Sequence, residues 1–143
     1  KTKQHSFFAI NTGLPTSTTG QCVEHVKQFK QDLTLWQAFS ETTYQFKNAL
    51  ETDNTTLLKN AIQENHQLLV KIGVVPKAIQ QFILQLKSIE FVAKISGAGS
   101  ISGNHAGMLI ASGDDELALQ ALCAKYQYPY FKVSGEKNGA RAD

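Results

Sequence analysis

Apolar residues recur with a helical period over much of the first two thirds of the chain, after one short segment typical of a strand. Residues 6–11 are apolar and aromatic and end in a turn at 12–15, which predicts a strand. From Cys22 onward, apolar side chains return every three or four positions, as on one face of a helix. We expect four helices between residues 16 and 89. The first follows the N-cap candidates Thr16–Thr19, and the second follows a break near Asp32–Thr34. The third is capped by Asp53 or Asn54 and ended by Gly73, and Pro76 opens the fourth.

The hydrophobic period changes to that of strands after residue 90. Segments 91–95, 107–111 and 130–133 are short and apolar, and an acidic start at 113–116 predicts a helix between the last two. The polar stretch 135–141 leaves room for one more short strand. The order of one strand, four helices, two strands, one helix and one strand predicts an α+β fold, with helices packed on one face of a small, mostly antiparallel sheet.

Length and composition fit one globular domain over residues 1–143. The chain is 42% hydrophobic and 18% charged, which is enough apolar surface to bury a core. It starts without Met and close to its first strand, so we expect a piece of a longer polypeptide. A net charge of +2 from scattered lysines favours neither a nucleic-acid nor a membrane partner.

The two cysteines indicate a reducing compartment. Cys22 and Cys123 are too far apart for a C-x-x-C motif, so a disulfide framework and a thiolate zinc site both lack support. No apolar run reaches the roughly 18 residues of a membrane span, and no signal-peptide core follows the N-terminus. We therefore expect a soluble cytoplasmic protein.

A glycine-rich segment, Ser96–Gly103, joins two predicted strands. Its three glycines allow the backbone to approach a ligand closely and to point several N–H groups at it. The hydroxyls of Ser96, Ser100 and Ser102 add donors. A plain hairpin loop explains the same glycines equally well, so the segment alone does not decide between binding and structure.

A second segment, Thr12–Gly20, places several hydroxyls at the start of a predicted helix, where an anion is favoured. Ordinary helix capping requires only one Ser or Thr. Because four follow one another at residues 16–19, hydroxyls remain for a ligand, and Ser17 and Thr18 are candidates for binding it.

Other candidates for chemistry are weaker. His25, His66 and His105 are too widely separated for a local metal motif, and His66 on an amphipathic helix is more often a packed or surface residue than a ligand. Cys22 has no neighbouring base to activate it as a nucleophile, so we expect a buried thiol. The chain has no P-loop, no dinucleotide fingerprint and no G-x-S-x-G motif. We expect no metal ligand in it.

Together the two segments resemble the C-terminal half of the GHMP kinases, which include galactokinase, homoserine kinase, mevalonate kinase and phosphomevalonate kinase. Asn11–Thr18 is similar to the family's Asp/Asn-Thr-Gly-x-x-x-Ser-Thr stretch, and Lys94–Gly99 matches the start of its Lys-x-x-Gly-Ala-Gly-Gly-Gly-Gly motif. Asn65–Val74 resembles a stretch typical of the mevalonate kinase branch. Ser100, Ile101 and Ser102 replace the later glycines of the third motif, which also favours that branch over galactokinases.

The resemblance implies a ferredoxin-like C-terminal domain of an ATP-dependent small-molecule kinase that phosphorylates the primary hydroxyl of mevalonate in isoprenoid precursor synthesis. Its sites would be substrate and phosphate contacts at Gly97, Ala98, Gly99, Ser17 and Thr18, with Asn65, Gly73 and Val74 supporting the substrate side. By the same resemblance, ATP and Mg²⁺ are held mostly by an N-terminal domain that lies outside this chain. That domain carries the phosphate loop, the acidic base and a lysine, so no catalytic residue is expected here and the fragment alone is expected to be inactive.

Alternatives remain open at this stage. Within the enzyme class, phosphomevalonate kinase and homoserine kinase share the same motifs. From another class, a non-catalytic regulatory domain could sense a small anion through the same glycine-rich loop. The oligomeric state of the protein is open as well, and a homodimer is one possibility.

Overall fold

The computed structural model describes residues 6–133 and confirms the predicted order of elements. Each strand and helix predicted within these residues is present, with a short 3-10 turn, η1, at the end of the first helix. The elements in chain order are β1 (Phe7–Asn11), α1 (Thr19–Val26), η1 (Lys27–Phe29), α2 (Leu33–Glu51), α3 (Thr55–Lys71), α4 (Lys77–Ser88), β2 (Val92–Ile95), β3 (Met108–Ser112), α5 (Glu116–Tyr126) and β4 (Tyr130–Val133). The strand suggested at 135–141 lies outside the described residues.

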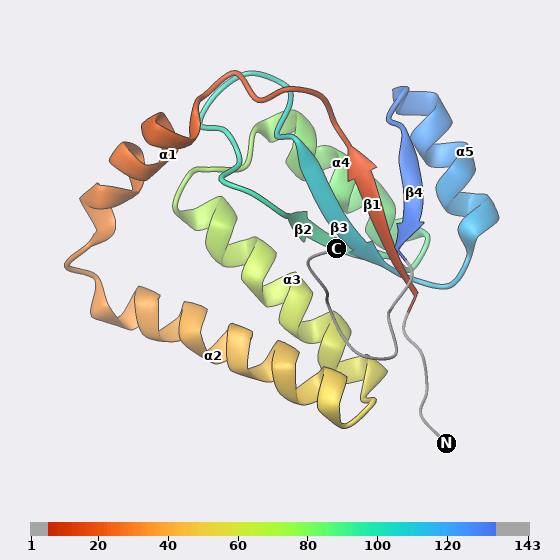
Figure 1. The fold of residues 1–143 in the computed structure, drawn as a ribbon, viewed down its shortest axis with the longest axis horizontal. Helices are drawn as coiled ribbons and strands as arrows, with labels where there is room; N and C mark the ends of the chain where they lie inside the picture. Colours follow the sequence, from red (N-terminus) through yellow and green to blue (C-terminus); the bar gives the residue numbers. More distant parts are fainter. Residues whose placement is uncertain (1–5, 134–143) are drawn as a thin grey trace, which may run out of the picture.

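The four strands form one antiparallel sheet in the order β2-β3-β1-β4 (Figure 1). β1 is central and pairs with β3 in a register that sets Phe8 opposite Ala111 and Ile10 opposite Leu109. β2 and β4 are therefore the two edges. Because all pairs are antiparallel, the ends of β1 and β2 meet the start of β3 at one end of the sheet. The predicted α+β class is confirmed.

The main core lies between one face of the sheet and the helices α4 and α5; in Figure 1, α4 runs behind the sheet and α5 lies beside β4. Strand residues alternate between faces, so every second side chain points to these helices. Phe82 of α4 is fully buried, and its ring contacts Tyr126 and Tyr128 edge-on at centroid distances of 4.9 and 4.8 Å. The strand residues in this core are Phe8, Ile10, Ala93, Ile95, Leu109 and Ala111.

A smaller cluster extends the packing to the opposite face at the β2 side of the sheet. Ala49 of α2 packs there with Leu58 and Ile62 of α3, and the cluster reaches Phe7 and Val92, whose side chains alternate with those of the main core. Helices α4 and α5 thus take the predicted position on one face, while α2 and α3 pack beside β2 and contact part of the other. Along β4 that second face keeps two apolar side chains exposed, Phe131 at 59% and Val133 at 38%.

Capping side chains fix most helix starts where the sequence places them. Thr18 and Gln21 form a reciprocal capping box at α1, and the side chains of Asp32, Asn54 and Asp115 accept from the first turns of α2, α3 and α5. Asn54 is the cap rather than Asp53. Among the described residues, no helix has the length and apolar character required to cross a membrane.

Truncation of Phe82 tests the main core. Phe82→Ala removes a ring that joins α4 to the end of α5, and we expect a loss of about 3–5 kcal/mol in the free energy of unfolding. Leu84→Ala on the same helix is the matched control, because Leu84 is 65% exposed and its truncation should change stability by no more than about 0.5 kcal/mol. Urea denaturation followed by circular dichroism measures both; similar losses in the two variants would contradict this assignment of the core.

Candidate functional site

The two segments singled out from the sequence lie against each other at the end of the sheet where β1 and β2 finish. The backbone N–H of Ser17 donates to Ser100 Oγ at 3.0 Å, and the N–H of Ile101 donates to Ser17 Oγ at 3.1 Å. Both hydroxyl-bearing residues are buried. This reciprocal pair joins the two segments across more than 80 positions of sequence.

Ser100 also anchors the glycine-rich loop from within. Its N–H donates to the Val74 carbonyl at 2.9 Å and its hydroxyl donates to the Ser102 carbonyl at 2.8 Å, while the side chain is fully buried. The serine that interrupts the family's glycine run thus has a structural role, because its side chain supplies bonds that a glycine lacks. The sequence predicts the Ser100 hydroxyl as a donor to a ligand; in the structure it donates to the protein instead.

A third segment, residues 105–108, completes the wall and was not singled out in the sequence. The Thr12 hydroxyl donates to the Gly107 carbonyl at 2.7 Å and accepts from the Ala106 N–H at 3.0 Å. The His105 ring nitrogen Nδ1 lies 2.6 Å from the Thr12 carbonyl oxygen. Gly103 and Gly107, both at positive φ, were the available signal, since they mark a chain that turns sharply before β3.

These three segments enclose a hollow of about 240 Å³. It opens between the glycine-rich loop and the start of α1, where the N–H groups of the first helical turn favour an anion. Every residue that lines it has a neutral side chain: Pro15, Ser17, Thr19, Ser96, Gly97, Ala98, Gly99, Ala106, Gly107 and Met108. The hollow can therefore contribute hydrogen-bond donors and close backbone approach, but no charge of its own.

The glycines of the loop differ in what surrounds them. A methyl group built on Gly97 would meet no atom within 4 Å, whereas one on Gly99 would collide with the Val74 carbonyl oxygen. Gly99 also has a φ of +76°, which disfavours other residues. Gly99 is thus required by the fold, while a side chain on Gly97 would meet none of the residues in the range 6–133.

The remaining predicted site residues take different positions. The Thr18 hydroxyl caps α1, and Val74 supports the loop from behind through its carbonyl group. Gly73 follows the end of α3 at a φ of +81°, so the predicted C-terminal cap is confirmed. Asn65 lies apart, in a separate hollow between α2, α3 and the sheet, where its amide donates to Thr42 Oγ1 at 3.0 Å.

Burial sets the chemistry of the groups near the loop. The Cys22 thiol lies 3.5 Å from the Gly99 carbonyl oxygen, and burial raises its pKa, which keeps it protonated. Burial lowers the pKa of Lys94, whose ammonium donates to the Ile95 carbonyl at 2.9 Å. Within residues 6–133, no cluster of three or more His, Cys, Asp or Glu side chains could hold a metal ion.

Substitution of Gly99 and of Gly97 distinguishes a glycine that the fold requires from one that it does not. Gly99→Ala should lower the free energy of unfolding by about 2–3 kcal/mol, because the methyl group meets the Val74 carbonyl in a backbone conformation that already disfavours it. Gly97→Ala should change it by less than about 0.5 kcal/mol. Thermal and urea unfolding check both values, and equal stability of the two variants would show that the loop is not held against Val74.

Comparison with known proteins gives a fold but no close relative. No family model matches the sequence, and no curated protein matches it. Among solved structures, L. major mevalonate kinase in complex with R-mevalonate shares the fold at a TM-score of 0.75 with 18% identity, over 93% of this chain and 44% of that one. Methanococcus jannaschii mevalonate kinase gives 0.75 and 19%, over 91% and 39%.

A third solved structure is that of a kinase with a different substrate in its name. Streptococcus pneumoniae phosphomevalonate kinase, in complex with phosphomevalonate and AMPPNP, gives a TM-score of 0.76 with 17% identity, over 93% of this chain and 41% of that one. The chain thus spans about two fifths of the length of these kinases. It has the fold of one part of the GHMP kinases, as its motifs predict.

Proposed function

We propose that this chain is the C-terminal domain of an ATP-dependent GHMP kinase and that its neutral hollow forms one wall of the site for substrate and phosphate. One observation carries the proposal. Two segments chosen from the sequence for their glycines and hydroxyls converge on one hollow, in a fold shared with three small-molecule kinases.

In this proposal the loop acts by shape and by its backbone. Gly97, Ala98 and Gly99 allow a ligand to approach the main chain, and Gly97 presents open space there. Ser17 and Thr18 hold the start of α1 beside the hollow, so that its N–H groups and dipole face the phosphate side. Gly73 and Val74 support the loop, and Asn65 would act at a distance by fixing α3 to α2.

The rest of the machinery would come from the part of the kinase that this chain does not span. Phosphoryl transfer depends on positioning and on neutralising phosphate charge, which calls for Mg²⁺, cationic groups and a residue that accepts the hydroxyl proton. The lining of the hollow offers none of these charges. On this proposal the N-terminal domain supplies them and binds most of the ATP, and the chain alone is inactive.

Exposed apolar side chains on β4 would give that domain a place to pack. Phe131 and Val133 of β4 are 59% and 38% exposed on the face that α4 and α5 leave free. Burying such apolar side chains favours association at roughly 25 cal/mol per Å². The two cysteines, free and buried, suit the reducing cytoplasm in which we place the enzyme.

Mevalonate is the substrate we propose, on the resemblance of Asn65–Val74 to the mevalonate kinase branch. Phosphomevalonate is the second candidate, because the kinase that binds it matches this fold equally well. We expect the complete polypeptide that carries this chain to release ADP from Mg-ATP in the presence of mevalonate, and more slowly or not at all with phosphomevalonate or homoserine. ADP release in a coupled assay distinguishes the three. Turnover with none of them would contradict the proposed function, and turnover by residues 1–143 alone would contradict the need for a second domain.

Gly97→Ala tests the role of the loop in the same enzyme. We expect kcat/KM to fall by about 10- to 100-fold, because a methyl group added to a residue that lines the hollow obstructs the close approach of a ligand to the backbone and displaces the reacting groups by around an ångström. Gly20→Ala in α1 is the control, since its methyl group meets nothing closer than 3.9 Å and lies outside the hollow. Unchanged kcat/KM in Gly97→Ala would remove the loop from the site.

A further inference from the structure

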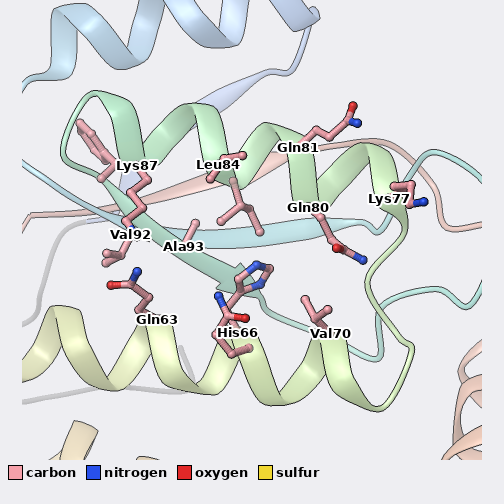
Figure 2. Close-up of a pocket in the computed structure, with 13 residues that line it drawn as sticks. Gln63, His66, Val70, Lys77, Gln80, Gln81, Leu84, Lys87, Val92 and Ala93 are labelled. Carbon is pink, nitrogen blue, oxygen red and sulfur yellow. The ribbon is translucent and has the colours of Figure 1, made fainter.

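A second and larger hollow, the α3–α4 groove, lies between these two helices and over the outer edge of β2 (Figure 2). Its volume is about 460 Å³, within the range of roughly 300–1,000 Å³ that small-molecule sites occupy. It shares no lining residue with the neutral hollow of the glycine-rich loop. The lining residues are Gln63, His66, Gln67, Val70, Lys77, Gln80, Gln81, Ile83, Leu84, Lys87, Phe91, Val92 and Ala93.

The floor of the groove offers backbone polar groups. β2 is an edge strand, and β3 is the only strand that pairs with it in the sheet formed by the described residues. Directly after β2, the N–H of Ser96 donates to the Met108 carbonyl of β3. In an antiparallel pair alternate residues bond to the neighbour, so the N–H and C=O of Ala93 point away from β3 and toward the groove that Ala93 lines.

His66 gives the groove an unpartnered polar group. Its side chain is only 7% exposed, and Figure 2 shows the imidazole directed from α3 into the space below α4. Within residues 6–133, its ring nitrogen Nδ1 has no hydrogen-bond partner. A buried polar atom is ordinarily paired, and His66 is one of the residues that line the groove, so a polar atom of a ligand bound there can supply the missing hydrogen bond once the ring turns toward it.

Charge and apolar surface along the groove select the kind of ligand. Lys77 and Lys87 stand at its two ends in Figure 2, and ten residues of one helix separate them by about 15 Å. Between them lie Val70 and Leu84, the latter 65% exposed. The lining contains no Asp or Glu.

The Lys77 end has a further source of positive potential. α4 begins directly after Pro76, and no side chain from the part of the chain that the structure describes caps its N-terminus. The N–H groups of the first turn therefore add to the lysine charge at this end.

We propose that the α3–α4 groove binds an elongated small organic anion with a carboxylate or phosphate group at each end and an apolar body between. One anionic group pairs with Lys77 beside the start of α4, and the other pairs with Lys87. The apolar body lies over Val70 and Leu84, and a polar atom of the ligand pairs with His66. This site is independent of the proposed kinase function.

The test uses sebacate, a linear ten-carbon dicarboxylate, with 1,10-decanediol as an uncharged probe of the same length. NMR titration of the protein should give saturable binding of sebacate with shifts at the His66 ring nitrogens, and much weaker binding of the diol. Lys77→Gln and Lys87→Gln should each weaken sebacate binding about three- to fivefold, as expected for loss of one exposed ion pair. Lys71→Gln on α3, outside the lining, should leave it unchanged.

Three results would overturn the proposal. The first is the absence of saturable sebacate binding up to about 10 mM, which corresponds to negligible affinity. The second is binding of the diol as tight as that of sebacate. The third is a loss of sebacate affinity in Lys71→Gln equal to that in Lys77→Gln and Lys87→Gln. The lysines are exposed, so their substitution does not threaten the fold. Because the readout is binding and not phosphoryl transfer, failure here and failure of the kinase assay are separable.

Discussion

The reciprocal hydrogen bonds between Ser17 and Ser100–Ile101 are the interaction on which the site depends. The first is buried and the second is partly buried, and both join the segment after β1 to the connection between β2 and β3. A buried hydrogen bond contributes only about 0.5–1.5 kcal/mol net, but leaving one partner unpaired costs about 1–3 kcal/mol. Together with the Cys22 contact to the Gly99 carbonyl and the Thr12 bonds to residues 106 and 107, the pair holds the segments in the relative position that forms the hollow.

The sequence predicts the fold well because its local signals agree with one another. The strand at Phe7–Asn11, the breaks at Asp32 and Gly73, and the start of α5 after Asp115 all rest on caps or on changes of hydrophobic period, which act within a few residues. The position of α2 and α3 partly over the second sheet face was not predictable in this way. An amphipathic pattern shows which side of a helix is buried, but not which neighbour buries it.

The same limit explains the outcome for individual site residues. The sequence brings Gly97–Gly99 and Ser17 to attention by type, and the fold places them together. It cannot show whether a hydroxyl faces a ligand or the protein, and for Ser100 the nearby Val74 and Ser102 carbonyls decide this. Asn65 follows a motif in sequence yet lies in another hollow, because its place on α3 directs it to Thr42. The unpartnered His66 nitrogen follows from packing alone.

The Val74 carbonyl connects two regions that share no lining residue. It accepts from Ser100 and leaves no room for a side chain on Gly99, yet it belongs to the short linker between α3 and α4. The glycine-rich loop therefore packs directly on the linker, through the hydrogen bond and the close contact that the Val74 carbonyl makes. The position of Gly99 is thus defined by a peptide group that lies between two helices, so the shape of the loop depends on how α3 and α4 are connected as well as on the strands that flank the loop.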